Sequence, residues 1–245
     1  MSEPVVADLT GKHLLVTGAA RGIGAAIAEA CVKAGAEVIG VDRDPVPGGI
    51  VADLGLPDAP EMIFSEAIGR WGQVDGLVNA AGLTTRASFT DADVQRFDAI
   101  IAVNLRAPFF LMAALIAHLR KREAPGAVVN IQSVNAHCGI EELAIYAASK
   151  GGLQTLTKNA GQAHMADRIR VNGINLGWVA TETERAIHAD KGAEWLERQG
   201  QAQPLGRFIR AEECAAQAVW MLSDASAPMS GVSIDLEQWV PGAAP

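Results

Sequence analysis

Short apolar runs alternate with longer segments of helical periodicity along almost the whole 245-residue chain. The runs predict buried strands, and the longer segments predict helices that cover those strands. The predicted strands lie at 13–17, 37–41, 50–53, 76–79, 127–132, 170–175 and 232–235. The predicted helices lie at 22–34, 59–71, 93–122, 145–165, 184–199 and 211–223. This alternation is typical of an α/β fold, here a doubly wound, seven-stranded parallel sheet with helices on both faces.

Composition and charge exclude several classes of protein. Hydrophobic residues make up 49% of the chain and charged residues 20%, which allows one buried core. No linker or repeat divides the sequence, so we expect residues 1–245 to form a single domain. Twenty basic residues against 28 acidic ones give a net charge of −8, which disfavours nucleic acid and anionic membrane surfaces as partners. A small-molecule substrate is the expected partner.

Cysteine usage and the most apolar segment bear on the cellular compartment. The three cysteines form no CxxC pair, which is typical of reduced thiols and predicts neither a disulfide framework nor a metal site. The N-terminal segment lacks the apolar core of a secretory signal. The most apolar window, 99–117, is interrupted by polar residues such as Asn104 and predicts a buried helix rather than a membrane span. We therefore expect a cytoplasmic protein.

A glycine-rich turn joins the first predicted strand to the first predicted helix. Gly18, Gly22 and Gly24 have the spacing G-x-x-x-G-x-G, which lets the backbone turn and approach a pyrophosphate at the positive end of the helix. The next strand ends at Asp42, whose carboxylate can accept hydrogen bonds from ribose hydroxyls. Glycines alone are also compatible with a simple tight turn, but the turn and Asp42 together favour a dinucleotide.

A second motif is the pair Tyr146 and Lys150, which share one face of a predicted helix because they are four residues apart. The ammonium of Lys150 is expected to stabilise the phenolate of Tyr146, and a depression of about two to three pKa units from about 10 would make that phenol a base near neutral pH. An ordinary surface tyrosine and lysine are the alternative. Tyr146 is the only tyrosine in the chain, which favours the functional interpretation.

Ser133 ends an apolar strand, at the edge of the sheet where ligands of open α/β folds bind. Its hydroxyl could donate a hydrogen bond to a substrate oxygen. A serine at this position is alternatively a turn former or a helix cap.

Taken together, these motifs resemble those of the short-chain dehydrogenase/reductase family in its common single-domain form. The resemblance runs from about Leu9 to Asp235 and implies a Rossmann fold. The matching motifs, in family order, are the glycine-rich turn at 17–24, Asp53 and Leu54, the turn at 79–82, Asn104, Ser133, Tyr146 with Lys150, and the segment 177–181.

The resemblance implies a role for each of four polar residues. Tyr146 would act as the general acid or base on the substrate oxygen, and Ser133 would hold that oxygen. Lys150 would lower the pKa of Tyr146 and bind the nicotinamide ribose. Asn104 would anchor a water molecule that links Lys150 to solvent, although it could alternatively pair with a buried backbone group.

The resemblance also implies a nicotinamide dinucleotide as cofactor. Asp42 indicates NAD, because its carboxylate would oppose a 2′-phosphate, whereas Arg21 and Arg43 favour NADP. The residues expected at the pyrophosphate are Gly18, Gly22, Ile23 and Gly24, and those expected at the adenine are Asp53 and Leu54. Asp42, Arg21 and Arg43 are expected near the adenosine ribose, and Asn79, Ala81 and Gly82 on the adenosine side of the cleft. Tyr146 and Lys150 are expected at the nicotinamide ribose, Val179 and Thr181 at the carboxamide, and Gly177 is a further expected cofactor contact.

Several positions depart from the family pattern. Gln132 replaces a common serine, Leu176 replaces a common proline, and Glu237 with Gln238 replaces a common pair of glycines. The segment between Asp42 and the third strand is also too short for the usual crossover helix, so we expect that helix to be missing or reduced.

The loops that should surround the substrate are rich in hydrogen-bonding groups. We expect a lid at 182–205 and substrate contacts from Arg86, Asn135, His137, Trp178, Glu184 and Trp195. These residues favour oxidation of a secondary alcohol, or the reverse reaction, on a sugar, polyol or sugar acid. A 3-oxoacyl-thioester reductase and a catalytically silent nucleotide sensor are the alternatives. The helices at 93–122 and 145–165 are the expected contacts of a homotetramer.

Overall fold

The computed structural model describes residues 7–240 and contains one seven-stranded parallel sheet. The strands are β1 (His13–Thr17), β2 (Glu37–Asp42), β3 (Ile50–Val51), β4 (Gly76–Asn79), β5 (Gly126–Ser133), β6 (Ile169–Leu176) and β7 (Ser233–Leu236). Their order in the sheet is β3-β2-β1-β4-β5-β6-β7, and every neighbouring pair is parallel. The order reverses between β1 and β4, which opens a crevice at the carboxyl ends of the strands. The predicted doubly wound sheet is confirmed.

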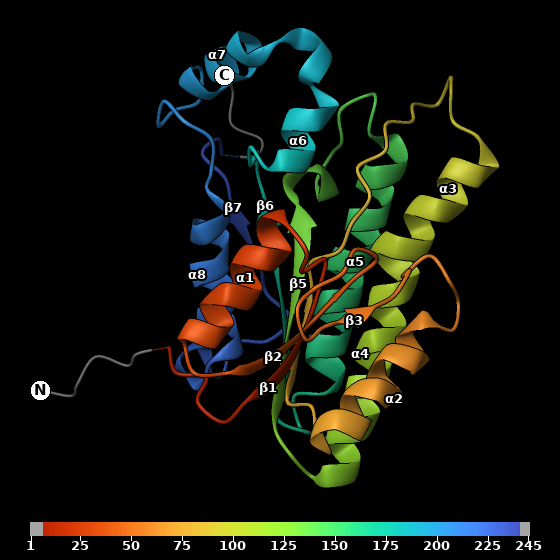
Figure 1. Ribbon diagram of the computed structural model, residues 1–245, viewed down its shortest axis with the longest axis vertical. Helices are drawn as coiled ribbons and strands as arrows, with labels where there is room; N and C mark the ends of the chain where they lie inside the picture. Colours follow the sequence, from red (N-terminus) through yellow and green to blue (C-terminus); the bar gives the residue numbers. More distant parts are fainter. Residues whose placement is uncertain (1–6, 241–245) are drawn as a thin grey trace, which may run out of the picture.

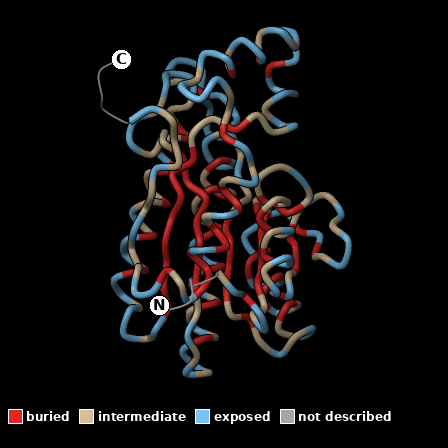
Figure 2. The backbone as a smooth tube through the Cα atoms, turned by 90° about the vertical axis from the view of Figure 1, so that its left-hand side faces the viewer, coloured by how far each residue is buried: buried red, intermediate tan, exposed pale blue. Residues whose placement is uncertain are grey.

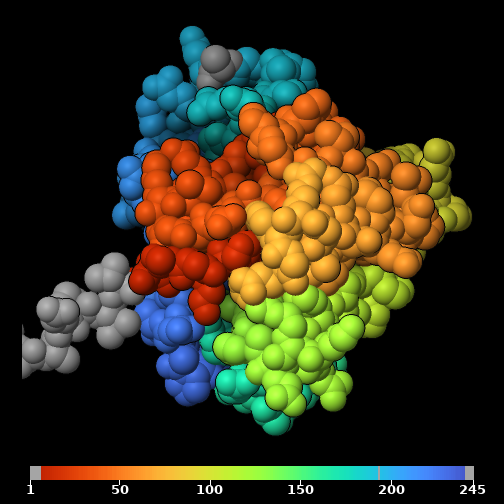
Figure 3. Space-filling view, turned by 60° about the horizontal axis from the view of Figure 1, so that its bottom comes forward, coloured from red at the N-terminus to blue at the C-terminus, as the bar shows by residue number. Residues whose placement is uncertain are grey.

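Helices cover both faces of this sheet. The α-helices are α1 (Gly22–Lys33), α2 (Ala59–Trp71), α3 (Val94–Ile101), α4 (Ala107–Arg122), α5 (Ala144–Ala163), α6 (Glu182–Ile187), α7 (Ala193–Gln201) and α8 (Ala211–Leu222). Helices α1 and α8 pack on one face, whereas α2, α4 and α5 pack on the other (Figure 1). In the space-filling view, α2 (orange) lies directly against α4 (green) (Figure 3). Helices α6 and α7 lie apart from both layers, beyond the carboxyl ends of the strands (Figure 1).

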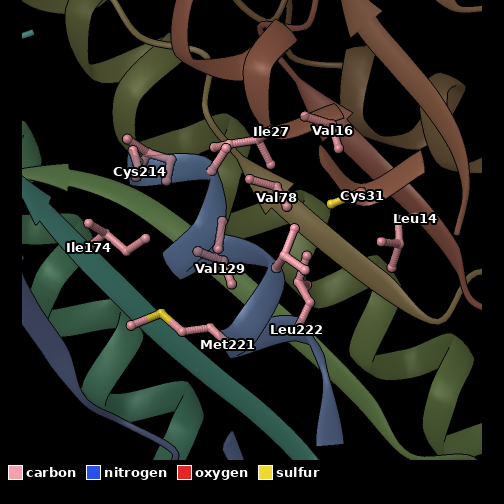
Figure 4. Packing of buried hydrophobic residues seen from close by; sticks show 14 of the residues in the cluster. Leu14, Val16, Ile27, Cys31, Val78, Val129, Ile174, Cys214, Met221 and Leu222 are labelled. Carbon is pink, nitrogen blue, oxygen red and sulfur yellow. The ribbon is translucent and has the colours of Figure 1, made fainter. Parts of the chain in front are cut away.

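The strands form the buried centre of the molecule (Figure 2). Successive side chains of a strand point to opposite faces, so Leu14 and Val16 join the core under α1 and α8, while Leu15 joins the core under α2 and α4. In the first core, Cys31 of α1 and Cys214 of α8 pack among aliphatic side chains from both helices and the sheet (Figure 4). Burial raises the pKa of each of these two thiols to about 12, so both are uncharged packing residues.

The helix predicted at 93–122 is interrupted, and this is the main difference from the predicted elements. Asp93 is the N-cap of α3 and accepts a hydrogen bond from the backbone N–H of Arg96. A π-helical turn (Ala102–Arg106) separates α3 from α4. Pro108 has no N–H, so the carbonyl of Asn104 loses the partner that it would have in an α-helix. This missing bond accounts for the local widening at Asn104.

The segment from Val94 to Arg122 is long and apolar enough to cross a membrane by length and composition alone. Its inner side packs on the sheet, where Leu111, Leu115 and Leu119 are fully buried. Its outer side exposes apolar rings, including Phe109 and Phe110. The segment is therefore a core helix with an unusually apolar outer side.

The connection from β2 to β3 contains no helix. A turn closed by a hydrogen bond from Gly49 N to Val46 O, at 2.9 Å, brings the chain back, and Val41 pairs in parallel with Ile50. The expected loss of the crossover helix is confirmed. The third strand is also shorter than the predicted 50–53, because the Asp53 carboxylate accepts a hydrogen bond from Gly55 N and turns the chain.

Candidate active site

The glycine-rich turn is packed against the turn that follows β4. Gly18 has φ = +70°, and a Cβ atom placed on it would lie 2.9 Å from the Cα of Ala81. A Cβ atom on Gly24 would lie 2.1 Å from the carbonyl oxygen of Gly18. The hydroxyl of Thr17 accepts hydrogen bonds from the backbone N–H groups of Ala80 and Ala81, at 3.1 Å each. Thr17 therefore holds the two turns together, a role that the sequence analysis did not assign to it.

The amino end of α1 is available to an anion. Arg21 at the N-cap makes no side-chain capping bond, and the first turn, which includes Ile23, contains no acidic residue. Its backbone N–H groups and the helix dipole suit a pyrophosphate, and the cradle leaves no room for a side chain at Gly18 or Gly24. The residues present thus fit a dinucleotide.

Asp42 lies beside the glycine-rich turn, as expected. Its Oδ2 accepts a hydrogen bond from Ala20 N at 3.0 Å, and its Oδ1 accepts one from Asp44 N at 3.1 Å. The guanidinium of Arg21 pairs with Asp44 at 2.7 Å, and Arg43 is exposed. The charge of Arg21 is therefore paired with the carboxylate of Asp44, close to the expected position of a 2′-phosphate.

Three of the residues expected near the adenosine differ in their exposure. Asp53 is exposed at the end of β3, and Leu54 is buried beside it. Asn79, however, is buried, and its Nδ2 donates a 2.8 Å hydrogen bond to Asn130 Oδ1. The side chain of Asn79 thus belongs to the polar groups beneath the cleft, and the expected contact of Asn79 with the adenosine stays a prediction.

On the nicotinamide side, the segment after β6 approaches the glycine-rich turn. A Cβ atom on Gly22 would lie 3.4 Å from the Cγ2 of Thr181. Val179 is buried and forms a backbone bridge with Ile209. Gly177 is covered by the carboxylate of Glu237, since a Cβ atom there would lie 2.1 Å from Glu237 Oε2. The substitution of Glu237 for a common glycine thus fills space above Gly177.

Tyr146, Ser133 and Lys150 come together at the carboxyl edge of the sheet. Ser133 is the last residue of β5, and Tyr146 lies in the first turn of α5 with 8% of its surface exposed. The hydroxyl of Ser133 is close enough to Tyr146 to lower the pKa of the phenol. The Nζ atom of Lys150 lies 5.7 Å from the centre of the tyrosine ring and donates a 2.7 Å hydrogen bond to the carbonyl of Ile131.

The expected effect of Lys150 on Tyr146 is wrong for this structure. Burial raises the pKa of the Tyr146 phenol, the Ser133 hydrogen bond lowers it, and the negative charge of Glu184 raises it. Burial also lowers the pKa of Lys150 to about 8, which weakens its positive charge. Desolvation therefore exceeds the influence of the ammonium. An ammonium has three donors, and Lys150 spends one on Ile131, so two remain for ligand hydroxyls.

Asn104 adopts the alternative role that the sequence analysis left open. Its Nδ2 donates to Leu83 O and to Ser149 Oγ, both at 3.0 Å, and its Oδ1 accepts a 2.8 Å hydrogen bond from Leu83 N. These bonds secure the turn after β4 against the π-helical segment. A Cβ atom on Gly82 would lie 3.5 Å from Lys150 Nζ, so this turn also closes over the lysine.

A buried polar cluster beneath the site was not predicted. Thr157 Oγ1 accepts 2.8 Å hydrogen bonds from Asn130 Nδ2 and Gln132 Nε2, and donates one to Leu153 O. The side chain of Gln132 fills the space above Gly173, where a Cβ atom would lie 2.3 Å from Gln132 Nε2. The signal was present in the sequence as two amides, Asn130 and Gln132, at alternate positions of an apolar strand.

Among the expected substrate contacts, Asn135 lies at the site. Its backbone N–H and its Nδ2 each lie 3.2 Å from Ser133 Oγ, so the hydroxyl accepts both and keeps its own proton to donate. Arg86 instead forms an ion pair with Glu142. His137 is 2.9 Å from Asp235 Oδ1, and both side chains are partly exposed.

The segment predicted as one helix at 184–199 forms α6, a 3₁₀ turn (Ala189–Lys191) and α7. Gly192 has φ = +78° and separates the turn from α7. The indole of Trp178 packs on Phe208, with ring centres 4.8 Å apart, and Trp195 packs on His188 at 4.7 Å. Trp178, Glu184 and Trp195 are thus brought together by the fold, and we call Trp178, Glu184, His188, Trp195 and Phe208 the lid cluster.

Comparisons with known proteins agree with this geometry. Residues 18–237 match the family model described as Enoyl-(Acyl carrier protein) reductase. L-xylulose reductase of Bos taurus is 33% identical over 242 residues, covering 94% of this chain and 96% of that protein. Gluconate 5-dehydrogenase of Gluconobacter oxydans is 32% identical over 247 residues, covering 94% of this chain and 95% of that protein.

Solved structures share the whole fold. A 3-oxoacyl (acyl-carrier-protein) reductase from Agrobacterium tumefaciens with NADP bound superposes with a TM-score of 0.87 at 27% identity. The match covers 94% of this chain and 95% of that one, so it includes the cleft as well as the sheet.

Proposed function

This chain belongs to the short-chain dehydrogenase/reductase family, and we propose that it interconverts a secondary alcohol and a ketone on a hydroxylated small molecule with NAD. The family reaction uses a nicotinamide dinucleotide and acts on CH–OH groups. When bound, the nicotinamide ring accepts or returns the hydride. The observation that carries the proposal is the burial of Tyr146, Ser133 and Lys150 together at the edge of the sheet.

Each of these residues has a chemical task in the proposal. Ser133 donates to the reacting oxygen, because both of its nearby amide contacts, from Asn135, occupy its acceptor sites. Tyr146, whose phenol is kept protonated by burial, gives its proton to the carbonyl oxygen during reduction, and its phenolate takes the proton of the alcohol during oxidation. Lys150 would use its two remaining donors on the ribose hydroxyls of the cofactor. The role of Asn104 in a proton relay remains a prediction. It is supported by the main-chain carbonyl of Asn104 in the π-helical turn, which lacks its α-helical partner because of Pro108 and could accept a hydrogen bond from water.

The preference for NAD rests on Asp42. Its carboxylate lies at the turn that would hold the adenosine ribose, and a 2′-phosphate there would meet like charge. Arg21, a basic residue of the glycine-rich turn, is paired with Asp44. The related structure from Agrobacterium tumefaciens binds NADP, so cofactor choice requires a direct comparison of the two dinucleotides.

For the substrate we propose a sugar, polyol or sugar acid. The supporting observations are the relatives that act on xylulose and gluconate, and the polar and aromatic groups of the lid cluster. In this proposal residues 1–245 act as one catalytic domain, and 182–205 close over the bound substrate and exclude water.

A screen of nicotinamide reduction tests the proposal. Wild-type protein and Tyr146→Phe are incubated with NAD or NADP and a panel of sugars, polyols, sugar acids and simple alcohols. We expect turnover of polyhydroxylated members with NAD, and its loss in the variant. Turnover confined to simple alcohols, or equal rates in both proteins, would contradict the proposal.

A second candidate is reduction of a 3-oxoacyl thioester, favoured by the similarity to the Agrobacterium tumefaciens reductase. Adding a 3-oxoacyl thioester with NADPH to the panel tests it. Faster turnover of the thioester than of any polyol would favour this second function, and cofactor binding without turnover of any compound would favour a nucleotide sensor.

We also propose a cytoplasmic homotetramer. The exposed apolar rings on the outer side of α3 and α4, among them Phe97, Phe109 and Phe110, supply surface for such contacts. Light scattering after size-exclusion chromatography should give about four times the 25.6 kDa mass of the chain. A monomer would contradict this assembly.

A further inference from the structure

Within the described part of the chain, the carboxylate of Glu184 is held at only one of its two oxygens. Its Oε1 accepts a 2.8 Å hydrogen bond from the indole N–H of Trp178 and lies 3.0 Å from His188 Nε2. Its side chain is 22% exposed, so the group is partly shielded from water. Its Oε2 makes no hydrogen bond within residues 7–240, and it does not belong to the buried polar atoms of that part of the chain that lack a partner. The carboxylate is thus anchored at one oxygen and open at the other.

The position of Glu184 relative to the reaction centre follows from two independent observations. Thr181 Oγ1 accepts a hydrogen bond from Glu184 N at 3.2 Å, and the same threonine lies against Gly22 of the glycine-rich turn. Helix α6 therefore starts at the cofactor side of the cleft. The negative charge of Glu184 also acts on Tyr146, where it raises the pKa of the phenol. The carboxylate is therefore close enough to the phenol to act on it electrostatically, and the start of α6 beside Gly22 places it on the cofactor side.

We propose that Glu184 makes this enzyme selective for neutral polyhydroxylated substrates over sugar acids. A carboxylate oxygen accepts hydrogen bonds from hydroxyl groups, and charge-assisted bonds of this kind are stronger than neutral ones. A substrate carboxylate would instead meet like charge in a partly dehydrated cleft. Lys150 is buried and bonded to Ile131, and the proposed function assigns its two remaining donors to the cofactor ribose, so they do not offset that charge. The inference rests on the proposed function and narrows its substrate class.

The first test compares a neutral and an anionic ketone of the same chemical type. L-xylulose is a neutral ketose, and 5-keto-D-gluconate carries a carboxylate. The assays use reduced cofactor at one fixed pH for both substrates and all variants. We expect the wild-type protein to favour L-xylulose in kcat/KM, and Glu184→Gln, which keeps the acceptor for Trp178, to reduce that preference by about tenfold or more.

Glu182→Gln is the matched control, because Glu182 is an exposed acid on the same helix. It removes one negative charge two residues away and should leave the ratio of the two substrates unchanged. An unchanged ratio in Glu184→Gln, or an equal change in both variants, would overturn the proposal.

A second test does not depend on turnover. Tyr146 is the only tyrosine, so the absorbance of phenolate during an alkaline titration reports this residue alone. The titratable groups around it are Lys150 on α5 and the bonded pair of Glu184 and His188. We expect Glu184→Gln to lower the midpoint and Glu182→Gln to leave it unchanged, with circular dichroism confirming that both variants are folded.

An unchanged midpoint in Glu184→Gln would show that the carboxylate does not face the phenol and would overturn the inference. A lowered midpoint in a protein that turns over no polyol or sugar would preserve the placement of Glu184 and contradict the proposed function instead. The two failures are therefore distinguishable.

Discussion

The floor of the cleft and its lid are built in different ways. In the floor, Ser133, Tyr146 and Lys150 are almost fully buried, and main-chain or buried polar partners hold the serine and the lysine. In the lid, Trp178 and Trp195 contact mainly other members of the lid cluster, and their connection to the sheet runs through the segment after β6. The difference teaches that the fold itself fixes the proposed proton-transfer groups, whereas the proposed recognition groups are held mainly by one another, so we expect their segment to move as a unit.

The largest expected effect is on the floor. Tyr146→Phe removes the proton acceptor and leaves packing nearly intact, so turnover should fall by about 10²- to 10⁴-fold with cofactor affinity little changed. Steady-state kinetics and fluorescence titration of the cofactor measure the two quantities. Turnover near that of the wild-type protein would mean that the floor does not carry the chemistry.

The next effect concerns cofactor choice. We expect NAD to be preferred over NADP by about two orders of magnitude in kcat/KM, equivalent to about 2.7 kcal/mol. Asp42→Ala should narrow this gap, because it removes like charge from the site of the 2′-phosphate and hydrogen-bond acceptors from the ribose. Kinetics with both dinucleotides on both proteins measure the ratio. Equal use of NADP by the native protein would contradict the role of Asp42.

A smaller effect is expected in the lid. Trp195→Ala removes the ring that packs on His188 and under the ammonium of Lys191, so KM should rise by about tenfold with a smaller change in kcat. Trp220→Ala is the control, since this partly exposed ring lies near the end of α8, is not part of the lid cluster and should leave KM unchanged.

Limited proteolysis tests closure of the segment 184–199 in the unmodified protein. Cleavage within 184–199 should slow when cofactor and a confirmed substrate are both present, because closure protects the chain. Cleavage at an unaltered rate would show that the lid does not close, and the contrast with the floor would lose its basis.

The smallest effect is on stability. The pKa of Lys150 is lowered to about 8, below the ordinary value of about 10.4, so the unfolded chain binds more protons between these pH values. The free energy of unfolding should therefore increase by about 1 to 3 kcal/mol as the pH rises from about 8 to about 10.4, so the protein becomes more stable. Lys150→Met should remove this rise in denaturant titrations at several pH values. The same slope in both proteins would contradict the burial of the amine.

Periodicity and glycine placement were sufficient to predict the sheet. The strands at 13–17 and 76–79 and the helix at 59–71 have the predicted bounds, because their apolar patterns end at sharp turns. The helix predicted at 93–122 was wrong in one respect, since the pattern carries no signal for the π-helical turn. That turn follows from one missing donor at Pro108, which periodicity does not register.

The sequence predicted where the site lies better than it predicted the pKa shifts of the site residues. Asp42 lies beside the glycine-rich turn and Tyr146 lies near Ser133 as expected, because the carboxyl ends of parallel strands meet at one edge of the sheet. The direction of the Tyr146 pKa shift was wrong, since spacing indicates that Lys150 is near but not that both groups are desolvated. Contacts that join distant segments, such as Glu142 with Arg86, also leave no local signal.

Hydrogen transfer to the cofactor tests the central claim most directly. The best polyol or sugar from the screen is prepared with deuterium on the carbinol carbon and oxidised by the wild-type protein with NAD. The account predicts that the deuterium is recovered in the reduced nicotinamide by mass spectrometry, and that Tyr146→Phe transfers it far more slowly. Recovery of the deuterium in solvent, or equal transfer by the variant, would contradict alcohol oxidation on this floor.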